Sequence, residues 1–457
     1  MHRFDERDRL LSREIFDYVE ARLGGAPTLN APTSEAELQR RVGETVTEDG
    51  LGAPEAFRIF RDTLAPACVN CGHPRFLSFI PHAPSTASTL FDLALSASGI
   101  FADWWIEGAG AVYAENQALR WLADLLDWPS DAGGVFVSGG TAGNLSALAV
   151  ARDDRRPQGD GSERRPAVAL AAGAHSSLRL AARVLDLDVL DVPSDDRGRM
   201  LGSALRRSVD ASELATCVVA ATAGTTNLGV IDDLGGIADL CEERGLWMHV
   251  DGAYGGAALA VPGIRNRFAG IERADSFVVD PHKWLFAPLD CAALLYRDPT
   301  LARRTFAQTA EYIDSVENRG EWNPSDYAVH LSRRARGLPF WFSLATHGTR
   351  TYAEAIEYAL GLARDAAGLI RETPYLELAF EPELSVVAFR RKGWEPRDYD
   401  RWSAATLADG LTLTAPTSWR GETLLRMCFL HPRTTLADVR EIVASLADHR
   451  PRTRRVE

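Results

Sequence analysis

Short apolar runs alternate with helix-like segments through the middle of the chain, from about residue 100 to residue 345. The runs are rich in β-branched residues and end in glycine-rich or polar turns, as at residues 134–137, 215–220, 246–250 and 276–279. This alternation predicts an α/β fold with a mostly parallel central sheet flanked by helices. Ligands of such sheets bind at the carboxyl ends of the strands, so functional residues are expected in the turns that follow the runs.

The two ends of the chain have different patterns. Apolar residues recur at helical spacing between residues 10 and 23, and a second helix is predicted at residues 36–42, after a break rich in Pro and Gly. The C-terminal pattern predicts a long helix at 352–371, strands at 383–390 and 423–429, and a closing helix at 436–447. The expected organisation is an N-terminal helical arm (1–70), a large domain (71–345) and a small C-terminal α/β domain (346–457).

Composition narrows the class of protein. The chain has 457 residues, of which 46% are hydrophobic and 25% charged, as in globular proteins with a sizeable core. Its net charge of −13 disfavours nucleic acid and anionic membrane surfaces as partners. The charged N-terminus is unlike a signal peptide, no apolar run is long enough to span a bilayer, and the six cysteines are scattered, which predicts a cytoplasmic location. Cys68, Cys71 and His73 have no second pair at metal-ligand spacing, so no metal site is predicted.

Lysine is rare in this chain. Lys283 and Lys392 are the only two, although Lys and Arg together number 50. A codon bias explains the use of arginine wherever only positive charge is needed. Arginine neither loses its proton at working pH nor forms an imine, whereas lysine does both. Lys392 lies in a basic turn where arginine would serve as well, so Lys283 is the candidate for lysine chemistry.

Three motifs follow predicted strands. Residues 138–144 (Ser-Gly-Gly-Thr-Ala-Gly-Asn) precede a helix, and small residues at a helix N-terminus suit an anion such as phosphate. Asp251 ends an apolar strand, where a carboxylate either caps a helix or pairs with a cationic ring nitrogen. Lys283 follows 32 residues later, flanked by Pro, His and Trp. A phosphate cradle, a carboxylate for a pyridinium and an imine-forming lysine are together the parts that pyridoxal 5′-phosphate requires.

At this point the sequence resembles the pyridoxal-phosphate-dependent group II amino-acid decarboxylases, which include the aromatic-L-amino-acid, tyrosine and tryptophan decarboxylases. The stretches that carry the resemblance keep the family's order and lie at 73–76, 137–148, 174–177, 222–232, 249–254, 275–284, 331–334 and 426–435. The resemblance implies a fold-type I enzyme. It also implies a homodimer with active sites at the subunit interface, in which the N-terminal helices wrap the partner.

The resemblance also implies roles for individual residues. Lys283 carries the internal aldimine, Asp251 keeps the pyridine nitrogen protonated, and His175 stacks on the outer face of the ring. Further cofactor contacts are expected at Gly139, Gly140, Thr141, Thr226, Ala253 and His282. Asp280 departs from the aromatic-amino-acid members, which often have an Asn in contact with phosphate there. A carboxylate suits an anion less well, and a hydrogen bond to backbone is the alternative role for Asp280.

Decarboxylation needs an acid that protonates Cα after carbon dioxide leaves. In the family this acid is a Tyr on a mobile loop that reaches in from the partner subunit. Residues 314–326 are polar and rich in turn formers, which suits such a loop. Tyr327 is the predicted donor and Tyr312 is the alternative.

The substrate pocket is expected to be aromatic. Phe79, Ile80 and Pro81 match the family segment that lines the side-chain pocket, with His82 as a polar contact, and Phe101 and Trp104 add aromatic surface. The expected reaction is decarboxylation of an aromatic L-amino acid to the amine and carbon dioxide. The alternatives are an aldehyde synthase, which combines decarboxylation with oxidative deamination, and another fold-type I enzyme such as an aminotransferase.

Overall fold

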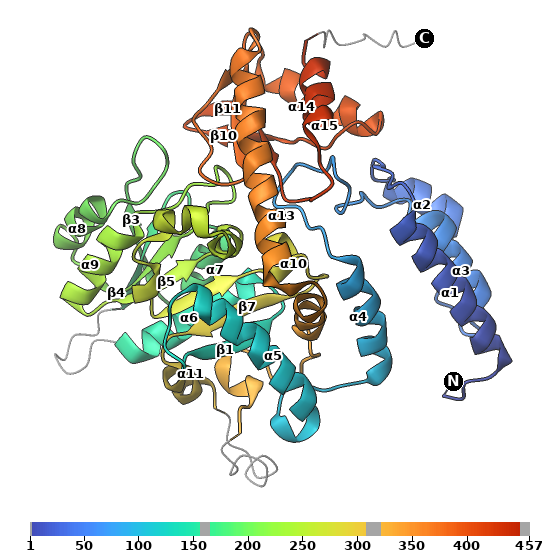
Figure 1. Cartoon of the computed structure of the whole chain (residues 1–457), viewed down its shortest axis with the longest axis horizontal. Helices are drawn as coiled ribbons and strands as arrows, with labels where there is room; N and C mark the ends of the chain where they lie inside the picture. The colour runs from blue at the N-terminus through green and yellow to red at the C-terminus, as the bar shows by residue number, and fades with distance from the viewer. Residues whose placement is uncertain (1, 156–164, 308–320, 448–457) are drawn as a thin grey trace.

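The computed structural model describes residues 2–155, 165–307 and 321–447. Figure 1 shows three parts. They are a large sheet with helices around it, a smaller C-terminal unit that includes part of the long helix α13, and an N-terminal arm of helices α1, α2 and α3 that stands apart from the body. The α/β class predicted from the sequence is confirmed, with a seven-stranded sheet and a four-stranded sheet.

The large sheet has the strand order β1-β7-β6-β5-β4-β2-β3, and all its strands except β7 run parallel to one another. Its strands are β1 (Gly133–Val137), β2 (Pro166–Ala171), β3 (Asp188–Val192), β4 (Ala215–Thr222), β5 (Trp247–Asp251), β6 (Ser276–Val279) and β7 (Ala292–Tyr296). The connecting helices are α4 (Thr86–Ser98), α5 (Trp105–Leu125), α6 (Gly140–Arg155), α7 (Ser176–Val184), α8 (Gly202–Asp210), α9 (Leu234–Arg244), α10 (Pro281–Trp284) and α11 (Pro299–Phe306). Short helical turns add η2 (Gly255–Ala260), η3 (Pro262–Phe268), η4 (Ile271–Arg273) and η5 (Pro324–Tyr327).

Both faces of the large sheet are buried, which explains why its strands read as continuous apolar runs rather than as alternating ones. In β4, Val219 and Ala221 belong to one apolar cluster, and Val218 and Ala220 belong to the cluster on the opposite face. All four side chains are fully buried. Because β1, β2, β4, β5 and β6 run in the same direction, their carboxyl ends lie at one edge of the sheet. The turns that follow these five strands meet there.

The C-terminal unit begins at α13 (Leu338–Glu372), which is longer than the predicted helix and kinks at Gly348, where φ is +74°. Its other elements are β8 (Leu376–Leu378), β9 (Val386–Arg391), α14 (Pro396–Ala408), β10 (Pro416–Trp419), β11 (Glu422–Cys428) and α15 (Leu436–Ser445). The predicted domain boundary after residue 345 lies inside α13. Leu77, far away in sequence, is buried in the apolar cluster of this unit, and its carbonyl accepts from the Cys428 N–H at 2.9 Å.

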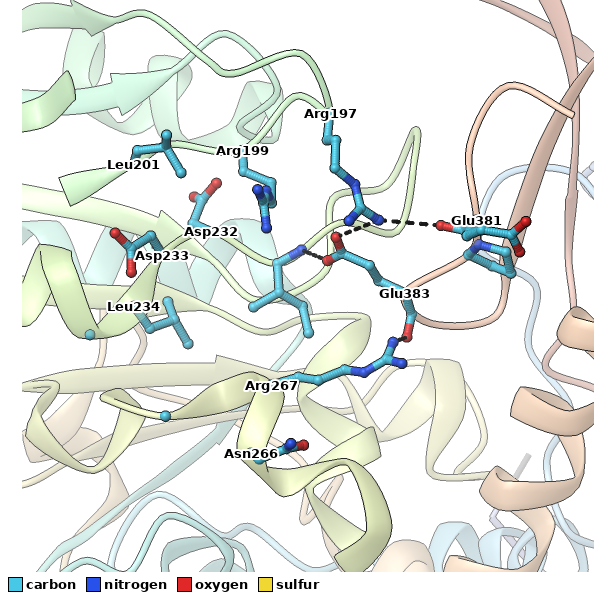
Figure 2. Close-up of a pocket in the computed structure, with 14 residues that line it drawn as sticks. Arg197, Arg199, Leu201, Asp232, Asp233, Leu234, Asn266, Arg267, Glu381 and Glu383 are labelled. Carbon is cyan, nitrogen blue, oxygen red and sulfur yellow. Dashed lines mark hydrogen bonds and ion pairs between the residues drawn. The ribbon is translucent and has the colours of Figure 1, made fainter. Parts of the chain in front are cut away.

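A charged contact joins the C-terminal unit to the large sheet at a cavity of about 600 Å³ (Figure 2). Glu383, just before β9, forms an ion pair with Arg197 at 2.9 Å and accepts from the backbone N–H of Ile231 at 2.9 Å. Arg267, from η3, donates to the Glu383 carbonyl. One ion pair, Arg197–Glu383, and two hydrogen bonds to Glu383 thus cross this cavity, so we assign it a docking role between the two units.

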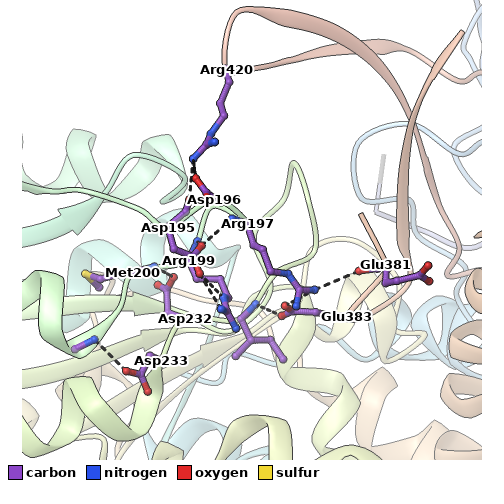
Figure 3. Close-up of polar contacts among 12 residues, drawn as sticks. Asp195, Asp196, Arg197, Arg199, Met200, Asp232, Asp233, Glu381, Glu383 and Arg420 are labelled. Atoms are coloured by element: carbon purple, nitrogen blue, oxygen red, sulfur yellow. Dashed lines mark hydrogen bonds and ion pairs between the residues drawn. The ribbon is translucent and has the colours of Figure 1, made fainter. Parts of the chain in front are cut away.

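A buried aspartate connects that cavity to the edge of the sheet (Figure 3). Asp232 accepts from the backbone N–H groups of Met200 and Thr222, each at 2.7 Å. Burial raises the pKa of Asp232 to about 7, although both backbone donors oppose that shift. Thr222 is the last residue of β4, so Asp232 holds the strand end that borders the candidate site.

The N-terminal arm consists of α1 (Glu6–Gly24), α2 (Glu35–Val42) and α3 (Ala53–Ile59), which continues as the π-helical turn η1 (Phe60–Leu64). Neither α1 nor α2 contains a buried residue, and Leu10 and Phe16 are 52% and 61% exposed. Figure 1 shows the arm beside the body rather than within it. Among the described helices, none is long and apolar enough to cross a membrane.

Candidate active site

A cavity of about 330 Å³ lies at the common edge of the parallel strands. Its walls come from the turns after β1, β2, β4, β5 and β6, as the strand pattern predicted. The predicted residues that line it are Gly139, Gly140, Thr141, His175, Thr226, Asp251, Ala253, His282 and Lys283. The fold thus gathers segments more than 140 residues apart into one chamber, since it joins parallel strands whose ends coincide.

Lys283 lies on the short helix α10, with 20% of its side chain exposed. Its Nζ is 2.8 Å from Oδ2 of Asp280, whose side chain is 1% exposed. Burial disfavours the ammonium form, but the charge and hydrogen bond of Asp280 raise the pKa of Lys283 above its ordinary value. Asp280 is therefore the counter-ion of the lysine, a role that the sequence left open. Its other oxygen, Oδ1, is buried and has no hydrogen-bond partner among the described residues.

Asp251 ends β5 and is 4% exposed. Its Oδ1 accepts from the Ala253 N–H at 3.1 Å, and its Oδ2 accepts from Nδ2 of Asn144 at 2.9 Å. Oδ1 of Asn144 lies 2.9 Å from Nε2 of His249. Nδ2 of Asn144 also donates to Oγ of Ser177 at 2.9 Å. Sequence reasoning assigned no role to these three neighbours, although all lie inside the motifs that it singled out.

His175 immediately precedes α7 and caps it: the Ser177 N–H donates to the Nδ1 of His175 at 3.2 Å. The Oγ of Ser177 lies 2.8 Å from the same ring nitrogen. Two local contacts therefore fix the imidazole, which lines the cavity. His282 is also held, because its Nδ1 accepts from the Cys291 N–H at 3.2 Å, and burial lowers its pKa.

The glycine-rich turn before α6 needs its small residues. A Cβ placed on Gly140 would lie 3.2 Å from both carboxylate oxygens of Asp280 and 3.3 Å from Cβ of Ala253. At Gly139 no atom would lie within 4 Å of such a Cβ, so the backbone there borders open space. The first N–H groups of a helix have no intrahelical acceptor, which makes this end of α6 a cradle for an anion.

A second cavity, of about 300 Å³, lies on the other side of His175. Arg426, from β11, lines it and is only 6% exposed. Its Nη2 donates to the carbonyls of Phe79 and Thr226 at 2.5 and 2.6 Å, and its Nε donates to Asn227 at 3.2 Å. Among the described residues, no carboxylate pairs with Arg426 and nothing accepts from its Nη1. Burial lowers the pKa of Arg426, so an anionic ligand would relieve an uncompensated charge.

Tyr327 does not line either cavity in this chain. It ends η5, is 6% exposed, and stacks on Trp322 with ring centroids 4.0 Å apart. The expectation that it belongs to a mobile loop is corrected, because this packing and the bond from the Tyr296 hydroxyl to its carbonyl at 3.1 Å fix it in the core. Residues 321–326 of the predicted loop are packed as well, while Tyr312 lies outside the described residues.

The predicted substrate residues are dispersed. Phe79 lines the second cavity and is 64% exposed. The others line neither cavity within this chain: Ile80, Pro81, His82, Phe101 and Trp104. Phe101 is 58% exposed and lines a separate cavity, of about 460 Å³, beside Arg333 and Arg334.

Comparison with known proteins identifies the family. The family model described as "Pyridoxal-dependent decarboxylase conserved domain" matches residues 37–392, which is most of the chain. The chain belongs to the pyridoxal-dependent decarboxylase family. It is a carboxy-lyase, and its cofactor is pyridoxal 5′-phosphate.

Relatives of different specificity are about equally similar to this decarboxylase. The aromatic-L-amino-acid decarboxylase of Bacillus atrophaeus is 30% identical over 90% of this chain and 88% of its own. The L-2,4-diaminobutyrate decarboxylase of Rhizobium meliloti is 31% identical over 97% of this chain and 94% of its own. The crystal structure of Oryza sativa TDC with PLP and tryptamine has a TM-score of 0.88 at 26% identity, covering 98% of this chain and 99% of that one.

The residues present fit the cofactor. The glycine cradle at α6 would hold the phosphate, and Asp251 would hold the ring nitrogen. His175 and Ala253 would take the two faces of the ring, and Lys283 would bind its carbonyl carbon. When bound, pyridoxal phosphate supplies an electron sink for the bond that breaks.

Removal of the Asp280 charge tests its role as counter-ion. Asp280→Asn is expected to lower the pKa of Lys283, so more of the lysine is neutral and able to attack the cofactor at a given pH. At pH well below that pKa, each unit of decrease gives about tenfold more neutral amine. Stopped-flow absorbance, after cofactor is mixed with cofactor-free protein across a pH series, measures the rate. We expect a pH profile displaced to lower pH, whereas Asp298→Asn, at an exposed helix cap, leaves it unchanged. An unshifted profile in Asp280→Asn contradicts the assignment.

Proposed function

We propose that this decarboxylase acts on an aromatic L-amino acid and releases the amine and carbon dioxide. The observation that carries the proposal is the second cavity, which places an unpaired buried cation, Arg426, beside the exposed ring of Phe79 and the imidazole of His175. A site of this kind suits a ligand with a carboxylate at one end and an apolar side chain at the other.

The residues divide the work as follows. Arg426 binds a carboxylate and orients the substrate. Asp251, held by Asn144, keeps a proton on the ring nitrogen, because an ion pair favours the charged form. His175 would cover one face of the ring and exclude water, and Lys283 would hold the carbonyl carbon of the cofactor. Tyr327, the predicted donor of the proton to Cα, does not line this cavity within this chain.

The lining of the second cavity supports an aromatic rather than a diamino substrate. A distal ammonium group would need a carboxylate, and among the described residues that line this cavity none is acidic. Phe79 and Pro416 offer apolar surface instead. An acidic side chain would compete with the substrate's own carboxylate for the one arginine, Arg426.

We also propose that the enzyme is a homodimer. The arm leaves Leu10 and Phe16 exposed, and the body leaves Phe101, Ile106 and Tyr113 at 58%, 59% and 60% exposure. These side chains need a partner surface, and a second copy would also bring Phe101 toward a site. Sedimentation that gives a monomer at micromolar concentration contradicts this. The six free cysteines support a cytoplasmic location, where thiols stay reduced.

A substrate screen tests the reaction. The purified enzyme with cofactor is offered the twenty standard amino acids, dihydroxyphenylalanine and 2,4-diaminobutyrate, and carbon dioxide, amine, ammonia and peroxide are measured. We expect carbon dioxide and amine in equal amounts, fastest with an aromatic substrate. Fastest turnover of 2,4-diaminobutyrate or glutamate overturns the aromatic assignment. Ammonia with peroxide in place of amine establishes the aldehyde synthase, and transfer of the amino group to a keto acid establishes the aminotransferase.

A further inference from the structure

A buried chain of hydrogen bonds runs behind the cofactor cavity to Asp251. Nε1 of Trp247 donates to Oγ of Ser276 at 2.9 Å, and that oxygen lies 2.9 Å from Nδ1 of His249. Nε2 of His249 lies 2.9 Å from Oδ1 of Asn144, whose Nδ2 donates to Oδ2 of Asp251 at 2.9 Å. Trp247, His249 and Ser276 are fully buried, and Asn144 is 1% exposed. This chain of hydrogen bonds is therefore shielded from water.

The same amide extends the chain to His175. Nδ2 of Asn144 also donates to Oγ of Ser177 at 2.9 Å, and that hydroxyl lies 2.8 Å from Nδ1 of His175. One side chain, Asn144, thus contacts both the carboxylate assigned to the ring nitrogen and the hydroxyl that holds the histidine over the ring. Asp251 and His175 both line the cavity assigned to the cofactor.

The chemistry of the groups fixes the direction of every bond toward Asp251. An indole N–H only donates, so Ser276 accepts from Trp247 and its own proton is free for Nδ1 of His249. Burial lowers the pKa of His249 to about 4, so the ring is neutral at working pH and carries its proton on Nε2. That N–H donates to Oδ1 of Asn144, which leaves the amide N–H groups for Asp251 and Ser177.

The direction is also fixed toward His175. The hydroxyl of Ser177 accepts from Asn144, so its proton points to Nδ1 of His175. The backbone N–H of Ser177, which only donates, points to the same nitrogen at 3.2 Å. Nδ1 of His175 is therefore an acceptor with two donors aimed at it, and the neutral ring carries its proton on Nε2.

We propose that Asn144 is a positioning residue that locks His175 in the neutral Nε2–H tautomer while it orients Asp251, with His249 orienting the amide. The lock leaves His175 one N–H donor, on Nε2, for the substrate side of the cavity. The proposal concerns the cofactor chamber alone. It does not depend on which amino acid is the substrate. The substrate screen can therefore contradict the proposed reaction without affecting this proposal, and the measurement below can contradict this proposal without affecting the reaction.

The tautomer is measured directly in the cofactor-free protein. Histidine labelled with ¹⁵N gives ring-nitrogen shifts that distinguish a protonated nitrogen from an acceptor, and the signal of His175 is the one lost in His175→Gln. We expect the neutral ring of wild-type His175 to carry its proton on Nε2, with Nδ1 unprotonated. A proton on Nδ1 overturns the proposal.

Variants separate the lock from simple packing. Asn144→Leu keeps a side chain branched at Cγ but removes the amide, so His175 is expected to exchange between tautomers. The affinity of the cofactor-free protein for pyridoxal phosphate should fall roughly tenfold, as for a lost hydrogen bond to a charged group. Ser146→Ala, on the same helix but outside the chain of bonds, should change neither measurement. Equal effects in the two variants overturn the proposal.

A second pair keeps the test decisive if Asn144→Leu does not fold. His249→Gln retains an N–H donor at the position of Nε2, and His249→Leu does not. We expect His249→Gln to preserve the His175 spectrum and the pH dependence of the visible band of the bound cofactor, and His249→Leu to alter both. If both variants behave alike, His249 does not orient the amide and the proposal is overturned.

Discussion

Replacement of Lys283 by alanine is expected to abolish decarboxylation and to remove the visible absorption band of the bound cofactor. The loss of rate should be on the order of 10³-fold or more, as when a covalently acting side chain is deleted. Lys283→Arg is the sharper variant, because arginine keeps the positive charge beside Asp280, 2.8 Å away in the wild type, but forms no imine. Both variants should be equally inactive. Carbon dioxide release and the absorption spectrum of the protein with added cofactor measure the two effects.

The second lysine supplies a matched control. Lys392 is exposed and lies in the C-terminal unit, outside the lining of the cofactor cavity. Its Nζ donates to the carbonyl of Pro374 at 2.9 Å. Lys392→Ala should retain full activity. Borohydride reduction of the enzyme with cofactor should label one peptide, that of Lys283, because the chain has no other lysine near the site. Labelling of Lys392, or activity in Lys283→Arg, contradicts the assignment.

Arg333→Met is expected to lower the free energy of unfolding by about 3–5 kcal/mol, the cost of leaving a buried charge without its partner. The side chains of Arg333 and Glu115 are 1% and 2% exposed, and Nη2 lies 2.6 and 2.7 Å from the two carboxylate oxygens. Glu115 also accepts from the Gly337 N–H at 2.8 Å, so the pair ties α5 to the start of α13. Urea unfolding followed by far-UV circular dichroism measures the change.

The neighbouring arginine tests whether burial is the cause. Arg334 pairs with Asp92 at 2.6 Å, but these side chains are 39% and 25% exposed. Water and salt screen such a pair, so Arg334→Met should cost no more than about 1 kcal/mol. If the two variants are destabilised equally, the buried pair has no special weight in the fold.

Sequence patterns predicted the elements that carry the cavity. The strands expected near residues 134–137, 215–220, 246–250 and 276–279 are β1, β4, β5 and β6, because runs buried on both faces are continuous and apolar. Strands β2 and β3 were not singled out. The length of α13 was underestimated, since the helix begins at Leu338, before the kink at Gly348, and not at residue 352.

The site could be predicted where its residues belong to local motifs, and could not where packing decides. Tyr327 shows the difference: its polar, turn-rich neighbourhood indicates a loop, but the stack on Trp322 fixes it in the core. Phe101 was expected in the substrate pocket and lies on the surface of this chain. The loop assignment of Tyr327 failed because composition indicates how exposed a segment is and not which surface it packs against, whereas a role for Phe101 at a subunit interface stays a prediction.

By itself the sequence determined the fold class and the family, and it singled out Lys283 as the candidate for lysine chemistry, because short motifs at strand ends carry those properties. Only the tertiary structure decided how the groups are charged and oriented. Asp280 became the counter-ion of Lys283, Asn144 the link between Asp251 and His175, and Arg426 an unpaired cation beside Phe79. Each assignment depends on distances between residues far apart in the chain and on their removal from water, and both arise only when the strands assemble.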